Sequence, residues 1–247
     1  APKADLTMTK PTGTTSAPAP TPTPSKSLTL HVGTLNVIRW RLGTKNVRNY
    51  DDFKKGLDYS KRVSGFATMQ DKMGVSIFGT QESGQYADAN AISTKLGNGW
   101  KNILHGDDAG DLTQAIHFHP KRKLLDEGLY TTGDAVEVAY HNTATWTLLQ
   151  DVTTNVIFLV VSTHGEYRKR GTTSASTYDK LREKHTKVLI TKAETLAKAA
   201  ATKYKVKVVP VIFTGDFNQD RNDFYDGPGR AMKAAGYIDT YHAASKR

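Results

Sequence analysis

An acid and an amide, Asp216 and Asn218, stand two positions apart directly after an apolar, β-branched run at residues 208–213. Such a run, bounded by turn residues, predicts a buried strand that ends near Gly215. The spacing of two lets both side chains point to the same side of an extended chain. A carboxylate accepts hydrogen bonds and a carboxamide both donates and accepts, so the pair suits a metal ion, a water and a phosphate oxygen. A polar turn leaving the core is the alternative interpretation of the same residues.

Three other apolar segments end in the same way. The segments are 30–38, 75–80 and 156–161, and the polar residues at their ends are Asn36, Glu82 and His164. A glutamate directly after a buried strand costs desolvation free energy unless it is solvated, paired or bound to a cation, which makes Glu82 a candidate metal ligand. Asn36 and His164 could equally be hydrogen-bonded loop residues. The pattern therefore predicts four strand ends that carry polar groups to one edge of a sheet.

The order of these motifs resembles the endonuclease/exonuclease/phosphatase superfamily from about residue 28 to the end of the chain. The specific parts are Gln81-Glu82 and Gly215-Asp216-Phe217-Asn218, with Asn36 before them and Thr163-His164 between them. The resemblance implies an α/β fold, a four-layer αββα sandwich in which two mixed, mostly antiparallel sheets pack face to face with helices outside.

The resemblance also implies a role for each residue. Glu82 is then the principal Mg²⁺ ligand with help from Asn36, and Mn²⁺ or Ca²⁺ could take the place of Mg²⁺. His164, Asp216 and Asn218 form the catalytic group. Asp216 orients or deprotonates the attacking water, Asn218 holds a phosphate oxygen, and His164 stabilises the pentacovalent state.

The chain departs from the superfamily pattern after Asp239. The pattern continues there with an aspartate-bearing strand and a Ser-Asp-His triplet, and neither occurs before Arg247. We therefore expect a domain over residues 28–247 that lacks its last strands. Two interpretations stay open: the chain is cut short, or its site is incomplete.

Composition favours a polyanionic partner. The 247 residues include 34 Lys and Arg against 24 Asp and Glu, a formal net charge of +10, and no cysteine. The lack of cysteine excludes disulfides and thiolate metal sites, and the basic surplus suits nucleic acid or an anionic lipid head group. Basic residues close to the proposed site in the sequence are candidates for phosphate binding, although basic loop runs are usually only solvated: Arg39, Arg168, Lys169 and Arg170.

Residues 1–27 differ in composition from the rest, since they hold six of the nine prolines amid threonine, serine and alanine. This composition predicts a flexible linker or tail. A linker of this kind suggests a secreted or surface-associated protein, and an internal linker is the alternative. No apolar stretch is long enough to span a bilayer.

The remaining elements follow from periodicity. Helices are predicted at about 51–72, 87–96, 174–204 and 228–236, and further strands at 112–119, 122–130 and 144–151. His117 and His119 share a strand face and could ligate a metal, but no third ligand lies nearby in the sequence, so we assign them a structural role.

Together these features predict a Mg²⁺-dependent phosphodiesterase, with an endonuclease acting on DNA or RNA as the favoured function. The first alternative is the same chemistry on a phospholipid or an inositol phosphate. The second is a non-catalytic nucleic-acid-binding or structural module with an incomplete site.

Overall fold

The computed structural model describes residues 5–8, 28–37, 59–83, 86–97, 99–105, 114–131, 143–165, 175–218, 226–240 and 243. The strands in this part of the chain are β1 (Asp5–Met8), β2 (Leu28–Asn36), β3 (Ile77–Gln81), β4 (Lys101–His105), β5 (Gln114–Phe118), β6 (Arg122–Thr131), β7 (Thr143–Asp151), β8 (Ile157–His164) and β9 (Val211–Asp216). The helices are α1 (Tyr59–Met73), α2 (Tyr86–Leu96), α3 (Ala175–Lys203) and α4 (Gly227–Ala234).

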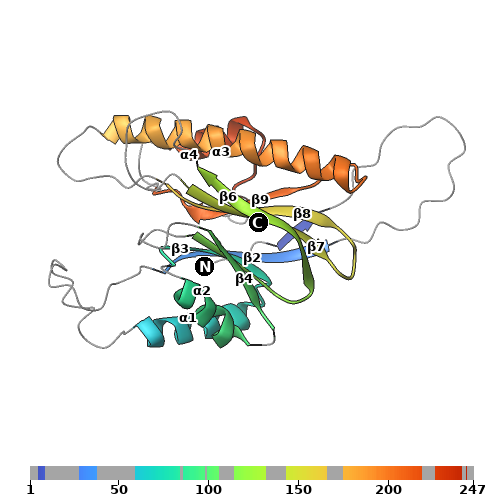
Figure 1. The fold of residues 1–247 in the computed structure, drawn as a ribbon. Coiled ribbons are helices and arrows are strands. Elements are labelled where there is room, and N and C mark those ends of the chain that lie inside the picture. Colours follow the sequence, from blue (N-terminus) through green and yellow to red (C-terminus); the bar gives the residue numbers. More distant parts are fainter. Residues whose placement is uncertain are drawn as a thin grey trace, which may run out of the picture.

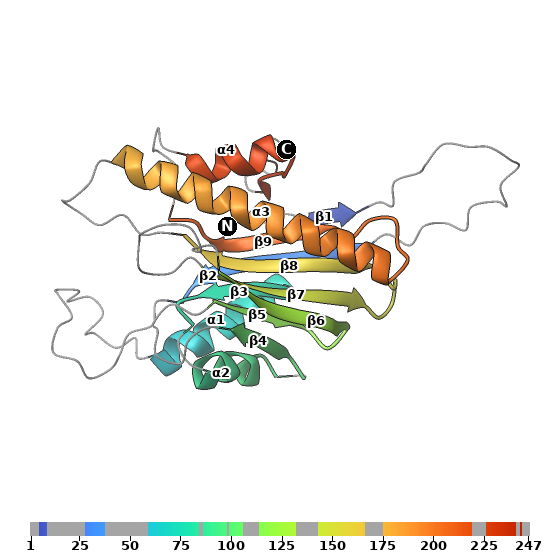
Figure 2. The same ribbon diagram turned by 45° about the horizontal axis from the view of Figure 1, so that its top comes forward.

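These strands form two sheets, with the orders β1-β2-β3-β5-β4 and β6-β7-β8-β9. The pairs β2/β3 and β8/β9 are parallel and the other described pairs are antiparallel. Helices α1 and α2 cover the outer face of the first sheet, and α3 and α4 cover the outer face of the second (Figure 1). Figure 2 shows α3 lying along the length of the second sheet with α4 beside it. The predicted αββα sandwich is confirmed.

Strand β8 shows why the apolar runs in the sequence are continuous rather than alternating. Phe158 and Val160 belong to the core between the sheets, while Leu159 and Val161 belong to the core under α3. Because successive side chains of a strand point to opposite faces, a strand with a sheet on one side and a helix on the other needs apolar residues at every position. The polar residues come only at the end of the strand, where Ser162, Thr163 and His164 are still buried.

The two sheets approach each other closely just below these strand ends. A side chain at Gly79 would meet the Thr214 hydroxyl and would lie 2.7 Å from Ser162 Oγ on the opposite sheet. Only glycine fits there, because any Cβ atom would push the sheets apart. This close approach lets side chains from the two sheets reach one another at the edge above.

Two strands of the structure, β1 and β4, were not among the predicted elements. Strand β1 lies within residues 1–27, the predicted linker, and pairs antiparallel with β2. Residues 3–10 contain no proline, so their backbone N–H groups remain available for strand pairing. Helix α1 begins at Tyr59, and the first part of the predicted helix, residues 51–58, lies outside the described residues.

Candidate active site

The two parallel strand pairs deliver the predicted residues to one end of the sandwich. Asn36 is the register partner of Gln81, which precedes Glu82, and His164 is the register partner of Asp216. In a parallel pair the carboxyl ends of both strands lie at the same edge. Each sheet therefore contributes two strand ends that carry predicted site residues, at the left-hand end of the molecule in Figure 1.

The side-chain amide of Asn36 joins the two sheets at this end. Its Nδ2 donates to Glu82 Oε1 over 2.8 Å and to Asp216 Oδ2 over 3.0 Å. Glu82 follows β3 of the first sheet, and Asp216 ends β9 of the second. One neutral amide group thus holds two carboxylates from different sheets side by side.

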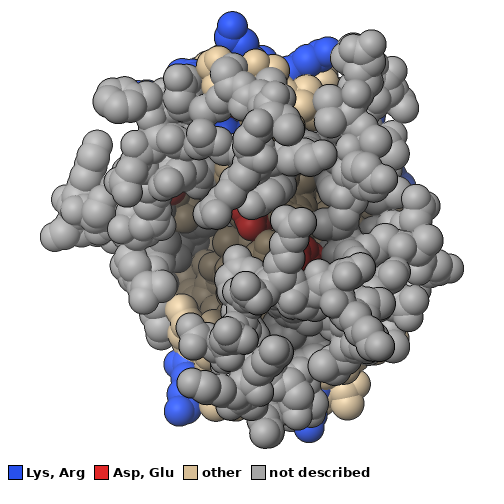
Figure 3. Space-filling model, turned by 90° about the vertical axis from the view of Figure 1, so that its left-hand side faces the viewer, with Lys and Arg blue, Asp and Glu red and all other residues tan. Residues whose placement is uncertain are grey.

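These two carboxylates have little compensating positive charge from the described residues. Among the residues that the structure describes, no lysine or arginine pairs with Glu82 or Asp216. His164 Nε2 lies 3.9 Å from Asp216 Oδ2, which is ion-pair distance but too long for a hydrogen bond. Figure 3 views the molecule from this end and shows acidic side chains near the centre of the face. Neighbouring carboxylates of this kind repel each other and favour a bound cation.

His164 is buried and held by the pairing of β8 with β9. The Gly165 N–H that follows it donates to the Asp216 carbonyl over 2.6 Å. The His164 Nδ1 atom is buried and has no hydrogen-bond partner in the described part of the chain. The ring therefore presents Nε2 toward Asp216, and no described residue on its other side fixes the tautomer.

Asn218 helps to fix the orientation of the Asp216 side chain. Its backbone N–H donates to Asp216 Oδ1 over 2.8 Å, which is an Asx turn, and its Nδ2 donates to the Gly165 carbonyl over 2.6 Å. The polar-turn interpretation of the Gly-Asp-Phe-Asn segment is therefore confirmed, and this turn orients the carboxylate of Asp216. A contact between Asn218 and a phosphate oxygen stays a prediction.

Glu82 adopts a backbone conformation that is uncommon for its residue type. Its φ angle is 55°, in the left-handed region, which costs a non-glycine residue roughly 1–3 kcal/mol. Asn218 has a φ of 51°, but asparagine tolerates this region far better. Strain of this kind persists where surrounding contacts impose it, and it concentrates at functional sites.

Sequence reasoning missed a polar connection directly beneath the site. Gln81, which is buried, donates from Nε2 to Ser162 Oγ over 3.2 Å and to Thr34 Oγ1 over 3.3 Å. This side chain ties β3 to its neighbour β2 and to β8 of the opposite sheet. The available signal was the hydroxyl residues inside otherwise apolar strands, Thr34, Ser162 and Thr214.

The structure does not describe the predicted basic residues, and it places His117 away from this cluster. Arg39, Arg168, Lys169 and Arg170 lie outside the described residues, so phosphate binding by them stays a prediction. Burial lowers the pKa of His117 to about 3, and its two ring nitrogens lie within hydrogen-bond distance of Ser93 and Thr80. In the described part of the chain, no three His, Cys, Asp or Glu side chains come together as a metal-binding group.

The donor set at the strand ends nevertheless fits Mg²⁺. The available ligands, Glu82, Asp216 and the amide of Asn36, are oxygen donors, and Mg²⁺ is typically bound by one or two carboxylates while it keeps several waters. A cage of three or more acidic side chains is not required. Mn²⁺ and Ca²⁺ accept the same donors.

No protein-family model and no curated protein matches the amino-acid sequence. Solved structures do match. An endonuclease/exonuclease/phosphatase family protein from Bacteroides thetaiotaomicron has a TM-score of 0.61 at 21% identity, over 81% of this chain and 67% of that chain. The mannosyl-6-phosphatase Bt3783 of Bacteroides thetaiotaomicron has a TM-score of 0.57 at 21% identity, over 81% and 69% of the two chains. The human Nocturnin catalytic domain with bound sulfate has a TM-score of 0.54 at 14% identity, over 73% and 63%. The chain therefore has the endonuclease/exonuclease/phosphatase fold.

Proposed function

We propose that this protein is a divalent-metal-dependent phosphoesterase that hydrolyses phosphodiester bonds of nucleic acid. The observation that supports it most is the Asn36 amide that bridges the Glu82 and Asp216 carboxylates, with His164 3.9 Å from Asp216. The arrangement offers anionic oxygens for a cation, an acid–base group and a histidine within one small region.

The side chains divide the reaction between them. Glu82 and Asn36 would hold the metal ion, which when bound neutralises charge on the phosphate and stabilises the leaving oxyanion. Asn36 Nδ2 and the Asn218 N–H each hold one oxygen of Asp216, and the remaining lone pairs can accept a proton from an attacking water. His164 Nε2, when protonated, would donate to a phosphate oxygen beside Asp216.

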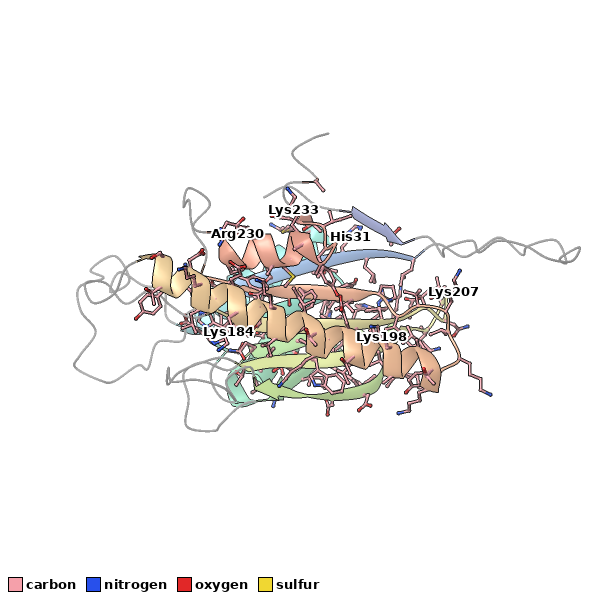
Figure 4. All side chains as sticks on the ribbon, turned by 90° about the horizontal axis from the view of Figure 1, so that it is seen from above. His31, Lys184, Lys198, Lys207, Arg230 and Lys233 are labelled. Carbon is pink, nitrogen blue, oxygen red and sulfur yellow. The ribbon has the colours of Figure 1, made fainter. Side chains whose placement is uncertain are left out.

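Charge favours nucleic acid as the substrate. The net charge of +10 attracts a polyanion. Support for a polyanionic substrate comes from the net charge of the whole chain, because the exposed lysines labelled in Figure 4 lie on the outer, helical side of the molecule rather than between the strand ends. These lysines are Lys184, Lys198, Lys207 and Lys233. None of the helices in the described part of the chain combines the length and apolar character of a membrane span.

A phosphomonoester on a small molecule is the second candidate. It is favoured by the likeness to a structure named as a mannosyl-6-phosphatase, with a TM-score of 0.57. The described site also contains no arginine or lysine that would follow a polymer backbone. A phosphorylated sugar or a lipid head group would need only the strand-end cluster.

A substrate panel distinguishes these possibilities. Plasmid DNA, RNA, mannose 6-phosphate, an inositol phosphate and a phospholipid vesicle are each incubated with the protein in Mg²⁺ and in chelator, at two salt concentrations. We expect chelator-sensitive cleavage of DNA or RNA that weakens as salt rises, because binding to phosphates releases condensed counterions. Phosphate release from the small substrates alone would support the second candidate.

Glu82→Gln tests the site itself, since it keeps the side-chain volume and removes the anionic ligand. The matched control is Glu127→Gln, which changes an exposed glutamate on β6. Loss of cleavage in Glu82→Gln but not in the control supports the proposal. Nucleic-acid binding with no turnover of any substrate by the wild type would leave the non-catalytic module as the function.

A further inference from the structure

A chain of buried polar side chains runs from α2 to the turn that carries Glu82. His117 on β5 has its Nδ1 2.9 Å from Ser93 Oγ on α2 and its Nε2 3.2 Å from Thr80 Oγ1 on β3. Thr80 Oγ1 lies in turn 2.5 Å from Ser83 Oγ. Asn102 on β4 donates to Ser93 Oγ over 3.2 Å and anchors the far end.

The donors and acceptors that form this row of hydrogen bonds can all be satisfied at once. Because His117 is neutral, one ring nitrogen donates and the other accepts. Asn102 then donates to Ser93, Ser93 to His117 Nδ1, His117 Nε2–H to Thr80, and Thr80 to Ser83. Hydrogen bonds aligned head to tail in a dry interior strengthen one another, whereas a missing member leaves its neighbours unsatisfied.

Two residues of this hydrogen-bonded network, Thr80 and Ser83, lie on either side of Glu82 in the sequence. Thr80 and Ser83 flank Gln81 and Glu82, so the contact between their hydroxyl groups closes the turn in which Glu82 has its φ of 55°. Gln81 points into the space between the sheets, where it contacts Ser162, and Thr80 points to the opposite face, under α2. The two residues before Glu82 are therefore held from both faces of the sheet.

We infer that the Glu82 brace, defined as His117, Thr80 and Ser83, is a positioning device: it imposes the left-handed backbone at Glu82 and thereby aims the carboxylate at Asn36 and at the cation beside it. The recorded hydrogen bonds of the three side chains go to one another and to Ser93. The brace acts through Glu82 alone. The inference rests on the proposed function only for the bound cation.

The ring of His117 has a packing role as well. The experiment must separate this packing from the hydrogen bonds of the brace. His117 stacks on Phe78 with centroids 4.5 Å apart and planes within 10°. A variant at His117 would disturb this stacking together with the hydrogen bonds. Thr80→Val and Ser83→Ala remove hydroxyl groups without touching the stack, and Ser83→Ala leaves His117 in contact with both Ser93 and Thr80.

The first measurement needs neither metal nor activity. The side-chain amide of Asn36 donates to Glu82 Oε1, so its resonances in a ¹⁵N–¹H spectrum of the metal-free protein report where the carboxylate lies. We expect them to shift in Thr80→Val and in Ser83→Ala and to stay in place in Thr80→Ser, which restores the hydroxyl. The matched control is Thr147→Val, which removes another buried strand hydroxyl, on β7.

The second measurement is Mg²⁺ binding by calorimetry without substrate. Loss of outer contacts to a ligand typically weakens metal affinity by about 10–100-fold. We therefore expect at least about a tenfold rise in the Mg²⁺ dissociation constant for Thr80→Val and Ser83→Ala, with recovery in Thr80→Ser. The unfolding midpoint in metal-free buffer should fall by a similar amount in Thr80→Val and in Thr147→Val.

The outcomes separate the brace from the proposed function. Unchanged Asn36 resonances and unchanged Mg²⁺ affinity in both brace variants, with a lowered unfolding midpoint, would show that the brace only stabilises the fold. If the wild type binds no Mg²⁺, the proposed function fails. The Asn36 resonances then decide alone whether the brace positions Glu82.

Discussion

Asp151 and Asp216 lie at opposite ends of the β6–β9 sheet, and the protein surrounds them differently. At the end of β7, Asp151 pairs with Arg122 and accepts hydrogen bonds from the Thr153 N–H (3.1 Å), the Thr154 N–H (2.7 Å) and the Thr154 hydroxyl (2.8 Å). At the end of β9, Asp216 accepts from the Asn218 N–H (2.8 Å) and shares the Asn36 amide group with Glu82, and its side chain is 32% exposed.

The difference shows which acid stabilises the fold and which is available to a ligand. Burial by itself would raise the pKa of Asp151, but the hydrogen bonds from Thr154, the charge of Arg122 and the Thr153 N–H outweigh it and lower that pKa. Both carboxylate oxygens of Asp151 are engaged inside the protein, Oδ1 by three hydrogen bonds and Oδ2 by Arg122. Among the described residues, no lysine or arginine pairs with Glu82 or Asp216, and neighbouring carboxylates without such a partner favour a bound cation.

The largest expected effect is on turnover in Asp216→Asn. Removing the proton-accepting group should lower the turnover number by about 10²–10⁴-fold, measured by cleavage of the substrate found in the panel. The free energy of unfolding should stay the same or rise slightly, because one of two repelling charges is gone. Asp126→Asn, on the exposed part of β6, serves as the control. Full activity in Asp216→Asn would remove Asp216 from the catalytic group.

The second effect is on stability in Asp151→Asn. Breaking a buried ion pair leaves Arg122 uncompensated and should cost about 3–5 kcal/mol of unfolding free energy, measured by urea denaturation. Turnover per folded molecule should stay within about twofold, since the pair lies at the far end of the sheet. A variant as stable as wild type would show that the saturated cluster does not support the fold.

As the pH falls, the free energy of unfolding should decrease first because histidines such as His117 are protonated on unfolding. Protonation of Asp151 should lower it only at a more acidic pH. The folded-state pKa of His117, about 3, lies below its ordinary value of 6.5. The unfolded chain therefore binds the proton first, and stability that is complete above pH 6.5 falls below it by up to about 1.4 kcal/mol per pH unit. Burial lowers the pKa values of His119 and His185 in the same direction.

Denaturation curves at pH 7, 6 and 5 test this assignment. Asp151 has its pKa lowered from 3.8, so the stability it contributes is lost only below that pH. Wild type and Asp151→Asn should therefore lose stability in parallel between pH 7 and 5, while His117→Gln should lose less. A decline that disappears in Asp151→Asn would assign it to the carboxylate instead.

The smallest effect is on the metal-free stability of Glu82→Gln. We expect an increase of at most about 1 kcal/mol, because removing this charge relieves its repulsion with Asp216. Mg²⁺ should raise the thermal midpoint of wild type, since a ligand that binds only the folded state stabilises it, and should do so much less in the variant. A decrease in metal-free stability beyond that of Glu127→Gln would indicate that Glu82 already has a stabilising partner.

The sequence was a good guide to the strands that carry the site and a poor one to what surrounds them. Asn36, Glu82, His164 and Asp216 were identified because each follows an apolar run, and strand burial produces that pattern locally. The predicted helix at 174–204 agrees with α3 for the same reason, since its apolar spacing is a property of one segment. The Glu82 brace could not be found this way, because Thr80 and Ser83 meet His117 only through the pairing of β3 with β5.

The sequence by itself determined the strand ends, the helix under which β8 is buried and the excess of positive charge. These depend on the types and spacing of neighbouring residues. Only the tertiary structure decided that Asn36 reaches across to Asp216, that Glu82 takes a left-handed backbone and that Asp151 is saturated while Asp216 is not. Those outcomes depend on how closely the two sheets pack, on the space left by Gly79 and on donors brought from distant parts of the chain, and no local pattern encodes such distances.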